Sequence, residues 1–160
     1  MITLDDVRSG VTAYSSLYRK DDLPLIQESP VYILNDSYIG PSDGPETKWP
    51  EPYPHAGRYG IYTIFGVSTL LYIGKASLQP IGKRLETYFR YEKNTRKCIT
   101  NRQHTWSAPP THIVAWAVPD ETRFEASALE EFLIWSFRGK LSDNRTGNGP
   151  NKLPPGVSRD

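Results

Sequence analysis

The sequence predicts a single α/β domain, in which a small three-stranded antiparallel sheet is flanked by helices in the order β-β-α-β-α and preceded by an N-terminal helical extension. The first observation is a pair of runs rich in β-branched and aromatic residues, 58–65 and 70–74, separated by the short turn GVST. The second is the alternation that follows, of a helical pattern, a third apolar run and a second helical pattern. Layers of helix and sheet around one core account for such an order.

The first 57 residues are expected to form an extension that packs on the core. Residues 4–20 predict a helix, because apolar side chains recur there at helical spacing, Thr3 can cap the first turn, and Asp5 and Asp6 suit its positive end. A short strand is expected at 31–34. From 40 to 57 the sequence is rich in Pro, Gly and Ser, which indicates a long connection rather than a linker between domains.

The core is expected over residues 58–146. Pro80 suits the first turn of a helix that continues to about Tyr91. Residues 94–111 are polar and predict an irregular loop, and 112–118 predict the third strand. Thr122 and Glu125 match a capping box ahead of the last helix. Residues 147–160 indicate an extended tail, and neither an internal repeat nor a second domain is evident.

Composition excludes several classes of protein. No apolar run approaches the roughly 18 residues that a membrane span needs, and the N-terminus lacks the order of a signal peptide. The single Cys98 excludes an internal disulfide framework and indicates a reducing, cytoplasmic setting. One cysteine and three scattered histidines argue against a structural zinc site.

Charge is unevenly distributed along the chain. The net charge is +1, yet residues 1–57 carry −5 and residues 58–160 carry +6. Cations crowd one stretch of the second part: Lys83, Arg84, Arg90, Lys93, Arg96, Lys97 and Arg102. Such a cluster is typical of a phosphate-binding surface. A solvated helix face followed by a basic loop is the alternative, and charge alone does not separate the two.

Two tripeptides and three single residues stand out in their order. Gly60-Ile61-Tyr62 and Tyr72-Ile73-Gly74 lie on the two predicted strands of the hairpin, and Arg84, Glu130 and Asn144 follow on or after the later helices. Each tripeptide alone is common, so the order carries the information. In these five elements the sequence resembles the GIY-YIG nuclease superfamily over roughly residues 58–146. Two aromatic strand residues in an ordinary core are the alternative.

These residue types also suit the hydrolysis of a phosphodiester, which needs an activated water and neutralisation of charge on the phosphoryl oxygens. Arg84 stays charged and can pair with two phosphate oxygens at once. Tyr62 and Tyr72 can project from one face of paired strands toward the same point. A tyrosine serves as a general base only if cations lower its pKa, and Lys75, Arg84 and a metal ion are candidates for this.

The resemblance implies a role for each matched residue. Glu130, the first residue of Glu-Glu-Phe-Leu-Ile, would hold one Mg²⁺ or Mn²⁺, while Glu131 would be an exposed helix residue. Tyr62, assisted by Tyr72 and Lys75, would activate water, and Arg84 would stabilise the developing charge. Asn144 would stabilise the site. Tyr88 stands where family members often have a histidine, so its role as a second donor is a departure from the family.

The products implied by the resemblance are a 5′-phosphate and a 3′-hydroxyl. Since little of the chain lies outside the core, a site-specific restriction endonuclease acting on double-stranded DNA is the first hypothesis, and a double-strand break then requires a homodimer or two successive nicks. A nonspecific defence or toxin-type nuclease acting on DNA or RNA is the second, and a non-catalytic nucleic-acid-binding module is the third. Contacts to nucleic acid are expected from Lys83, Arg90, Lys93, Arg96, Lys97, Asn101, Arg102, Gln103 and His104.

Overall fold

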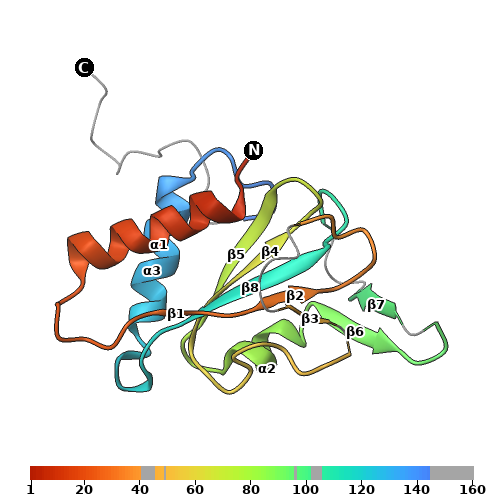
Figure 1. Cartoon of the computed structure of the whole chain (residues 1–160), viewed down its shortest axis with the longest axis horizontal. Coiled ribbons are helices and arrows are strands. Elements are labelled where there is room, and N and C mark those ends of the chain that lie inside the picture. The colour runs from red at the N-terminus through yellow and green to blue at the C-terminus, as the bar shows by residue number, and fades with distance from the viewer. Residues whose placement is uncertain (41–45, 49, 96, 102–105, 145–160) are drawn as a thin grey trace, which may run out of the picture.

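The computed structural model describes residues 1–40, 46–48, 50–95, 97–101 and 106–144, and it has mixed α/β architecture (Figure 1). The helices are α1 (Leu4–Tyr18), α2 (Ile81–Leu85) and α3 (Glu125–Ser136), with a 3₁₀ turn at Asp120–Thr122. The strands of the main sheet are β1 (Gln27–Glu28), β2 (Val31–Ile33), β3 (Glu46–Lys48), β4 (Gly60–Phe65), β5 (Leu70–Ala76) and β8 (His112–Ala117). A separate hairpin consists of β6 (Phe89–Glu92) and β7 (Lys97–Thr100).

The α/β class is confirmed, but the expected three-stranded sheet is wrong. The main sheet has six strands in the order β3-β2-β8-β4-β5, with β1 also paired to β8. The N-terminal segment supplies β1, β2 and β3, and the β2–β3 pair is parallel whereas the other pairs are antiparallel. Strands of two or three residues are too short to show an alternating pattern, which explains why only β2 was expected from the sequence.

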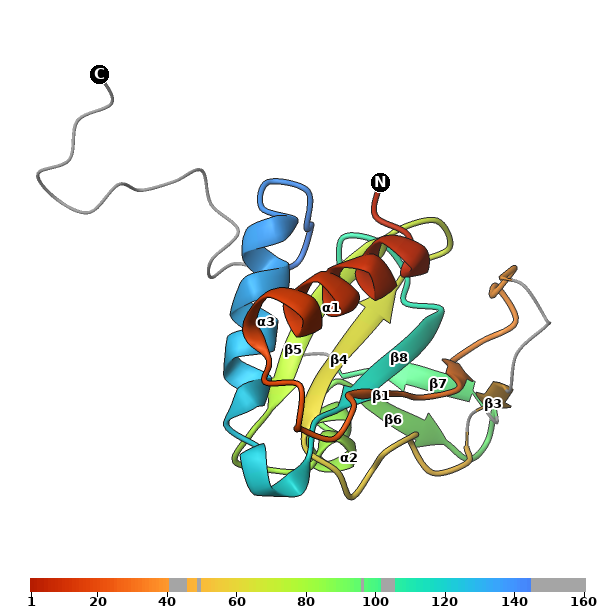
Figure 2. The ribbon, with the colours of Figure 1, turned by 60° about the vertical axis from the view of Figure 1, so that its left-hand side comes forward.

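The main sheet lies between two layers. Helices α1 and α3 cover one face, and α2 with the β6–β7 hairpin lies on the other (Figure 2). The α1–α3 side of the core contains Ile61, Ile73, Val114, Trp116, Leu129 and Leu133. The opposite side contains Tyr62, Ile64, Ala115, Leu85, Tyr88 and Phe89. Alternate residues of β4 therefore enter different cores, as the pleat requires.

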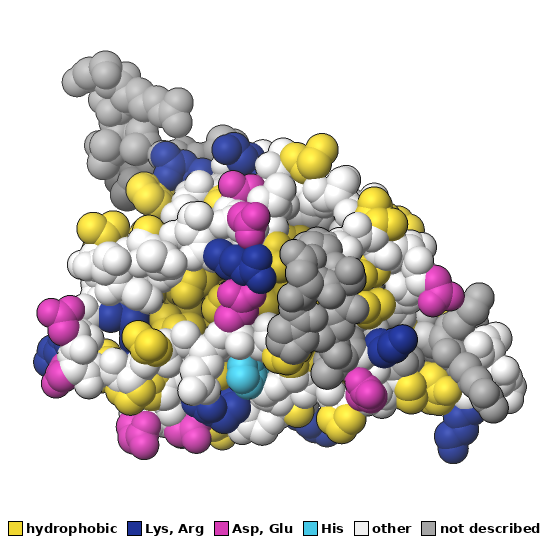
Figure 3. All heavy atoms as spheres, in the orientation of Figure 1, with side chains coloured by type: hydrophobic (Ala, Val, Ile, Leu, Met, Phe, Trp, Pro, Cys, Tyr) yellow, Lys and Arg dark blue, Asp and Glu magenta, His cyan; other side chains and the backbone are white. Residues whose placement is uncertain are grey.

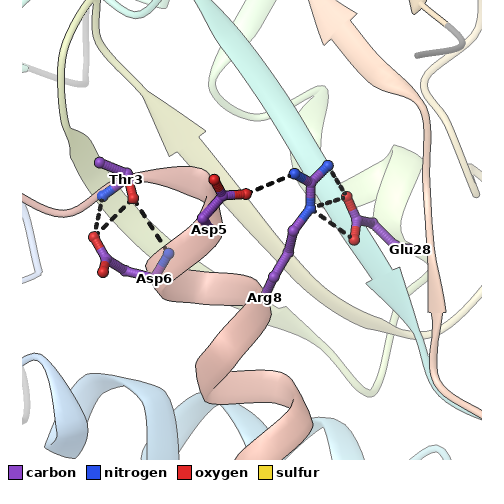
Figure 4. A network of polar contacts seen from close by, with 5 residues as sticks. All are labelled: Thr3, Asp5, Asp6, Arg8 and Glu28. Atoms are coloured by element: carbon purple, nitrogen blue, oxygen red, sulfur yellow. Dashed lines mark hydrogen bonds and ion pairs between the residues drawn. The ribbon is translucent and has the colours of Figure 1, made fainter. Parts of the chain in front are cut away.

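Helix α1 begins as predicted. The Thr3 side chain accepts a hydrogen bond from the backbone N–H of Asp6 at 3.2 Å, and the Asp6 carboxylate accepts one from the Thr3 N–H at 2.7 Å. One turn on, Arg8 donates to Asp5 at 2.8 Å and to Glu28 of β1 at 2.8 Å (Figure 4). Hydrogen bonds thus close the first turn of α1 and join this end of the helix to β1.

The helix expected from Pro80 to Tyr91 is wrong beyond its first turn. Helix α2 ends at Leu85, and the chain turns through Tyr88 into β6. The FRYE segment alternates apolar and polar side chains, so a strand satisfies it as well as a helix does. The irregular loop expected at 94–111 also contains a strand, because Lys97–Thr100 pairs with Phe89–Glu92.

The capping box expected at Thr122 and Glu125 is wrong as well. Helix α3 begins at Glu125 with Phe124 in the cap position and no side-chain cap. The Glu125 carboxylate instead pairs with Arg19, the residue that ends α1, and both side chains are buried. Thr122 donates a hydrogen bond to the same carboxylate at 3.3 Å from the end of the 3₁₀ turn.

No helix in the described ranges is long and apolar enough to cross a membrane. The tail expected at 147–160 lies outside the described residues.

Burial favours the neutral form of His112, which lies at the start of β8. The His112 ring stacks on Phe65 with centroids 4.8 Å apart, and its Nδ1 is 2.9 Å from the Thr111 hydroxyl. Burial lowers the pKa of His112 to about 4 from an ordinary value of 6.5. Because the folded pKa lies below the unfolded one, the stability linked to His112 is present above pH 6.5 and is lost as the pH falls toward 4.

Replacing His112 with phenylalanine is therefore expected to reduce the sensitivity of folding to acid. Between pH 7 and pH 4.5 the parent should lose about 2 kcal/mol more free energy of unfolding than H112F, as measured by urea denaturation. The other buried histidine of lowered pKa, His55, is present in both proteins, so its contribution cancels. Equal losses in the two proteins would show that His112 does not titrate in this way.

Candidate active site

The two motif tyrosines lie on the same face of adjacent strands. Across the β4–β5 pair, Tyr62 is opposite Gly74 and Tyr72 is opposite Ile64, so the side chains of Tyr62, Ile64 and Tyr72 point to the side of the sheet on which Gly74 leaves space. The Tyr62 ring lies directly over Gly74, where a Cβ would be only 2.3 Å from its Cζ. Gly74 therefore provides the space that the buried Tyr62 ring occupies.

The first glycine of the pair of tripeptides has a different role. Gly60 lies opposite Ala117 of β8 and Ala76 of β5, and a Cβ there would be 1.9 Å from the carbonyl oxygen of Trp116. Only a residue without a side chain lets β4 approach β8 this closely. Both motif glycines are thus explained by packing around the strands that carry the tyrosines.

A third tyrosine completes a chain of hydroxyl groups. The Tyr88 hydroxyl is 3.1 Å from that of Tyr62 and donates to that of Tyr72 at 3.4 Å. The turn after α2 positions it, since the Tyr88 N–H donates to the Leu85 carbonyl at 3.0 Å and its own carbonyl accepts from the Asn101 N–H at 2.7 Å. Tyr62 and Tyr88 are buried and Tyr72 is half-buried, so Tyr72 forms the outer end of the chain.

Burial determines the protonation of these hydroxyls. It raises the pKa of Tyr62 well above 10, with Tyr88 and Tyr72 adding to the effect, and it also raises the pKa of Tyr72. The Arg84 guanidinium works in the opposite direction at both tyrosines but does not overcome burial. We expected cations to lower these pKa values. Arg84 does act to lower them, but desolvation raises them by more. The Tyr62 and Tyr72 phenols are therefore neutral hydrogen-bonding groups.

Arg84 lies beside the tyrosines, at the last turn of α2. The Tyr62 phenol is the main cause that raises the pKa of Arg84, and Tyr88 and Tyr72 add to it. Its neighbour Lys83 points away, with its side chain 67% exposed and paired with Glu86 at 3.3 Å. The two consecutive cations therefore have different surroundings, and Arg84 is the one directed to the hydroxyl chain.

Glu130 reaches the same region from α3. Its carboxylate is 17% exposed and lies 3.3 Å from the Lys75 ammonium, which projects from β5. Burial raises the pKa of Glu130, while Lys75 and then Arg84 act to lower it. The adjacent Glu131 is exposed. The structure thus directs Glu130, and not Glu131, toward Lys75 and Arg84.

Asn144 closes the free edge of β5. Its amide oxygen accepts from the Ile73 N–H at 2.8 Å and its amide nitrogen donates to the Ile73 carbonyl at 2.8 Å. The next residue back, Asp143, donates its N–H to the Leu71 carbonyl at 3.1 Å and accepts two hydrogen bonds from Ser107. Asn144 therefore holds the strand between Tyr72 and Gly74 and does not face the hydroxyl chain.

The structure describes the side chains of only some of the residues expected to contact nucleic acid. Arg90 is exposed on β6, Lys93 is exposed in the turn of the hairpin, and the Asn101 amide donates to the Thr87 carbonyl at 3.3 Å. Arg96, Arg102, Gln103 and His104, together with the Lys97 side chain, lie outside the described residues. On the face that carries α1, acidic and basic side chains are interspersed (Figure 3), so that face offers no field of one sign.

Two aromatic residues near the tyrosines were not expected from the sequence. Trp106 contacts Tyr72 and Tyr88 with ring centroids 6.0 and 5.7 Å apart, and it stacks on Phe89. Trp106 is a large aromatic in a polar stretch of low helix and strand propensity, which was the available signal.

One carboxylate faces the candidate site, and this limits the metal it could hold. Within the described ranges, no three His, Cys, Asp or Glu side chains come together in a way that could hold a metal ion. Glu130 alone fits Mg²⁺ or Mn²⁺, since such ions keep several waters and are held by one or two carboxylates together with substrate phosphates.

Comparison with known proteins identifies no relative. No protein family matches the chain, and no curated protein or solved structure is significantly similar to it.

Replacing Gly74 with alanine is expected to displace the Tyr62 ring and to lower the free energy of unfolding by about 1–3 kcal/mol, because a new methyl group overlaps a buried side chain. Urea denaturation measures the change. Gly57→Ala is the matched control, since a Cβ at Gly57 contacts nothing within 4 Å. If both variants lose the same stability, the close approach of Tyr62 to Gly74 is not the cause.

Proposed function

We propose that this protein is a divalent-metal-dependent endonuclease of the GIY-YIG kind, which hydrolyses phosphodiester bonds of DNA to 5′-phosphate and 3′-hydroxyl ends. The observation that carries the proposal is the convergence of Tyr62, Tyr72 and Tyr88 beside Arg84, with Glu130 within electrostatic reach. Residues separated by almost seventy positions meet here, and their chemistry is that of a phosphodiesterase.

Arg84 supplies the positive charge for the phosphoryl group. A guanidinium fork donates two parallel hydrogen bonds to two phosphate oxygens, and it remains charged at every working pH. Burial beside neutral phenols strengthens this electrostatic contribution, since the local dielectric is lower than that of water. The hydroxyl chain thus gives the half-buried arginine a hydrogen-bonding neighbour in Tyr62.

The tyrosines position the attacking water and receive its proton. Tyr72 is the outermost of the three hydroxyls and therefore the one that a water or a phosphate oxygen reaches first. A phenolate is needed to accept the proton, and Arg84 is the cation that favours the phenolate at Tyr62 and Tyr72. A divalent cation, when bound, would polarise the phosphoryl group and lower the pKa of neighbouring acids.

Glu130 is the residue that would hold the cation, and Lys75 is its counter-ion in the absence of one. The ammonium favours the ionised form of the half-buried carboxylate and so opposes the effect of burial, which raises the pKa of Glu130. If Glu130 held a cation, Lys75 would be free to pair with a phosphate oxygen.

A restriction endonuclease specific for a site in double-stranded DNA is the first candidate. Each chain has one such site, so a double-strand break requires two chains or two successive nicks. A nonspecific defence or toxin-type nuclease, with RNA as an alternative substrate, is the second candidate.

Arg84→Ala is expected to retain the fold and to lower the rate of cleavage by about 10²–10³-fold, because it removes charge stabilisation from the transition state. Arg84→Lys should not restore full activity, since an ammonium cannot replace the bidentate fork. The measurement is cleavage of mixed plasmid DNAs and of RNA in Mg²⁺, with circular dichroism as the check on folding. Lys83→Ala is the matched control, and an R84A variant as active as K83A would contradict the assignment.

Glu130→Gln is expected to abolish cleavage, while Glu131→Gln is expected to leave it unchanged, since the amide keeps the size of the side chain but loses the charge that holds a hard cation. Activity of the parent should also disappear in chelator and return with Mg²⁺. The opposite pattern for the two glutamines would assign the metal to Glu131. Cleavage that persists in chelator would exclude the metal mechanism.

A further inference from the structure

A cleft lies next to the tyrosine chain and is not used by the proposed catalytic residues. Its volume is about 600 Å³. One wall is the β6–β7 hairpin, another is the segment from Trp106 to Pro110, and Leu34 and Asn35 of the N-terminal region complete it. Pockets of this size hold small organic molecules or parts of larger ones.

Two parallel aromatic rings line the cleft. Phe89 and Trp106 are inclined by only 8°, with centroids 6.1 Å apart. Both rings contact Tyr88, and Phe89 directly follows Tyr88 in the chain. The cleft is therefore continuous with the group of residues around Arg84, and a ligand in it lies beside whatever occupies the candidate active site.

The remaining lining combines apolar and hydrogen-bonding groups. Thr100 is paired with Phe89 across the hairpin, and Cys98 lies two residues away on the same face. On the opposite wall the Asn35 amide donates to the Pro110 carbonyl at 2.7 Å and accepts from the Ser37 N–H at 3.0 Å. An amide has two hydrogens and two lone pairs, so Asn35 is oriented by these bonds and can still pair with a ligand.

We propose that this cleft binds an unpaired nucleobase of the substrate strand, next to the phosphate held by Arg84. The inference rests on the proposed function. The half-buried Trp106 ring, which is backed by the buried Phe89 ring, can stack on the face of a base, while the oriented Asn35 amide and the Thr100 hydroxyl can bond to its edge. The faces of a base are covered by its neighbours in a duplex, so the base enters the cleft from a single strand or after leaving the helix.

Continuity with the phosphate site decides among ligands. An isolated apolar cleft would suit many molecules, but this one begins at the residue after Tyr88, whose hydroxyl is part of the candidate active site. A nucleotide carries a phosphate and an aromatic ring on the same sugar, so it can occupy the phosphate site and the adjoining cleft together. Lys93, exposed in the hairpin turn, adds a cation on the same element for the adjoining backbone.

Photo-crosslinking tests where the base lies. Mixed-sequence single-stranded oligonucleotides that contain 5-iodouracil are irradiated with the full-length protein in chelator, and the modified residue is identified by mass spectrometry. Crosslinks to Trp106 or Phe89 support the proposal. Crosslinks confined to other residues, in a protein that cleaves DNA or RNA in Mg²⁺, overturn it and leave the proposed function intact. If neither crosslinks nor cleavage is observed, both the base-binding proposal and the proposed function are overturned.

Filling the cleft gives a second measurement. Thr100→Phe places a ring opposite Phe89 and should raise KM for an oligonucleotide roughly tenfold, the scale of one lost stacking contact. Val67→Phe is the matched control, because it adds a ring at an exposed position of the β4–β5 turn, outside the cleft. An abasic site is then placed in turn at each position around the cut. At one position it should raise KM of the parent by a similar factor and leave KM of T100F unchanged. An unchanged KM in a folded T100F overturns the proposal. If T100F fails to fold by circular dichroism, Cys98→Leu fills the same face.

Discussion

The close contact between the Tyr62 ring and Gly74 is the constraint on which the candidate site depends. Tyr62 is completely buried, and it has this space because the residue opposite it on β5 lacks a side chain. With its ring fixed there, the hydroxyl lies 3.1 Å from that of Tyr88, which fixes the turn after α2. The same turn follows directly from the helix that carries Arg84. The absence of a Cβ at Gly74 thus allows β4, β5 and α2 to bring their residues together at the Tyr62 hydroxyl.

Burial of this group has a chemical consequence as well as a structural one. Hydroxyls removed from water are satisfied by one another, which makes the cluster rigid, and the same desolvation raises the pKa of Tyr62. A site that needs a phenolate must therefore place positive charge near it, and Arg84 is that charge within the structure. The proposed mechanism therefore requires positive charge beyond that of Arg84, which a divalent cation would supply.

Local patterns predicted the parts of the fold that are long or capped, and they failed where tertiary contacts decide. The hairpin of 58–65 and 70–74 and the start of α1 at Thr3 follow from residue pattern and capping. The strands β1 and β3 have only two and three residues and form because β8 and β2 offer partners. Phe89 lies on a strand and not on the predicted helix, and its ring stacks on Trp106. The spacing of apolar residues within one segment gives no information about such contacts between distant residues. The candidate site was expected from the order of its residues along the chain. Tyr62, Tyr72 and Glu130 lie on long elements, whereas Arg84 lies on the five-residue α2 and Tyr88 in the turn after it.

The position of Glu130 depends on residues that are outside the site. Helix α3 is held at its first residue by the buried pair of Glu125 and Arg19, and the chain beyond it is held to β5 by Asn144. Arg19 also donates to the carbonyl of Pro24 at 2.8 Å, so it joins the end of α1 to the approach to β1. Removing one partner of a buried ion pair leaves an uncompensated charge, which makes such a contact a strong restraint on geometry. The N-terminal segment consequently helps to position Glu130 beside Lys75, because Arg19 fixes the first residue of the helix that carries Glu130.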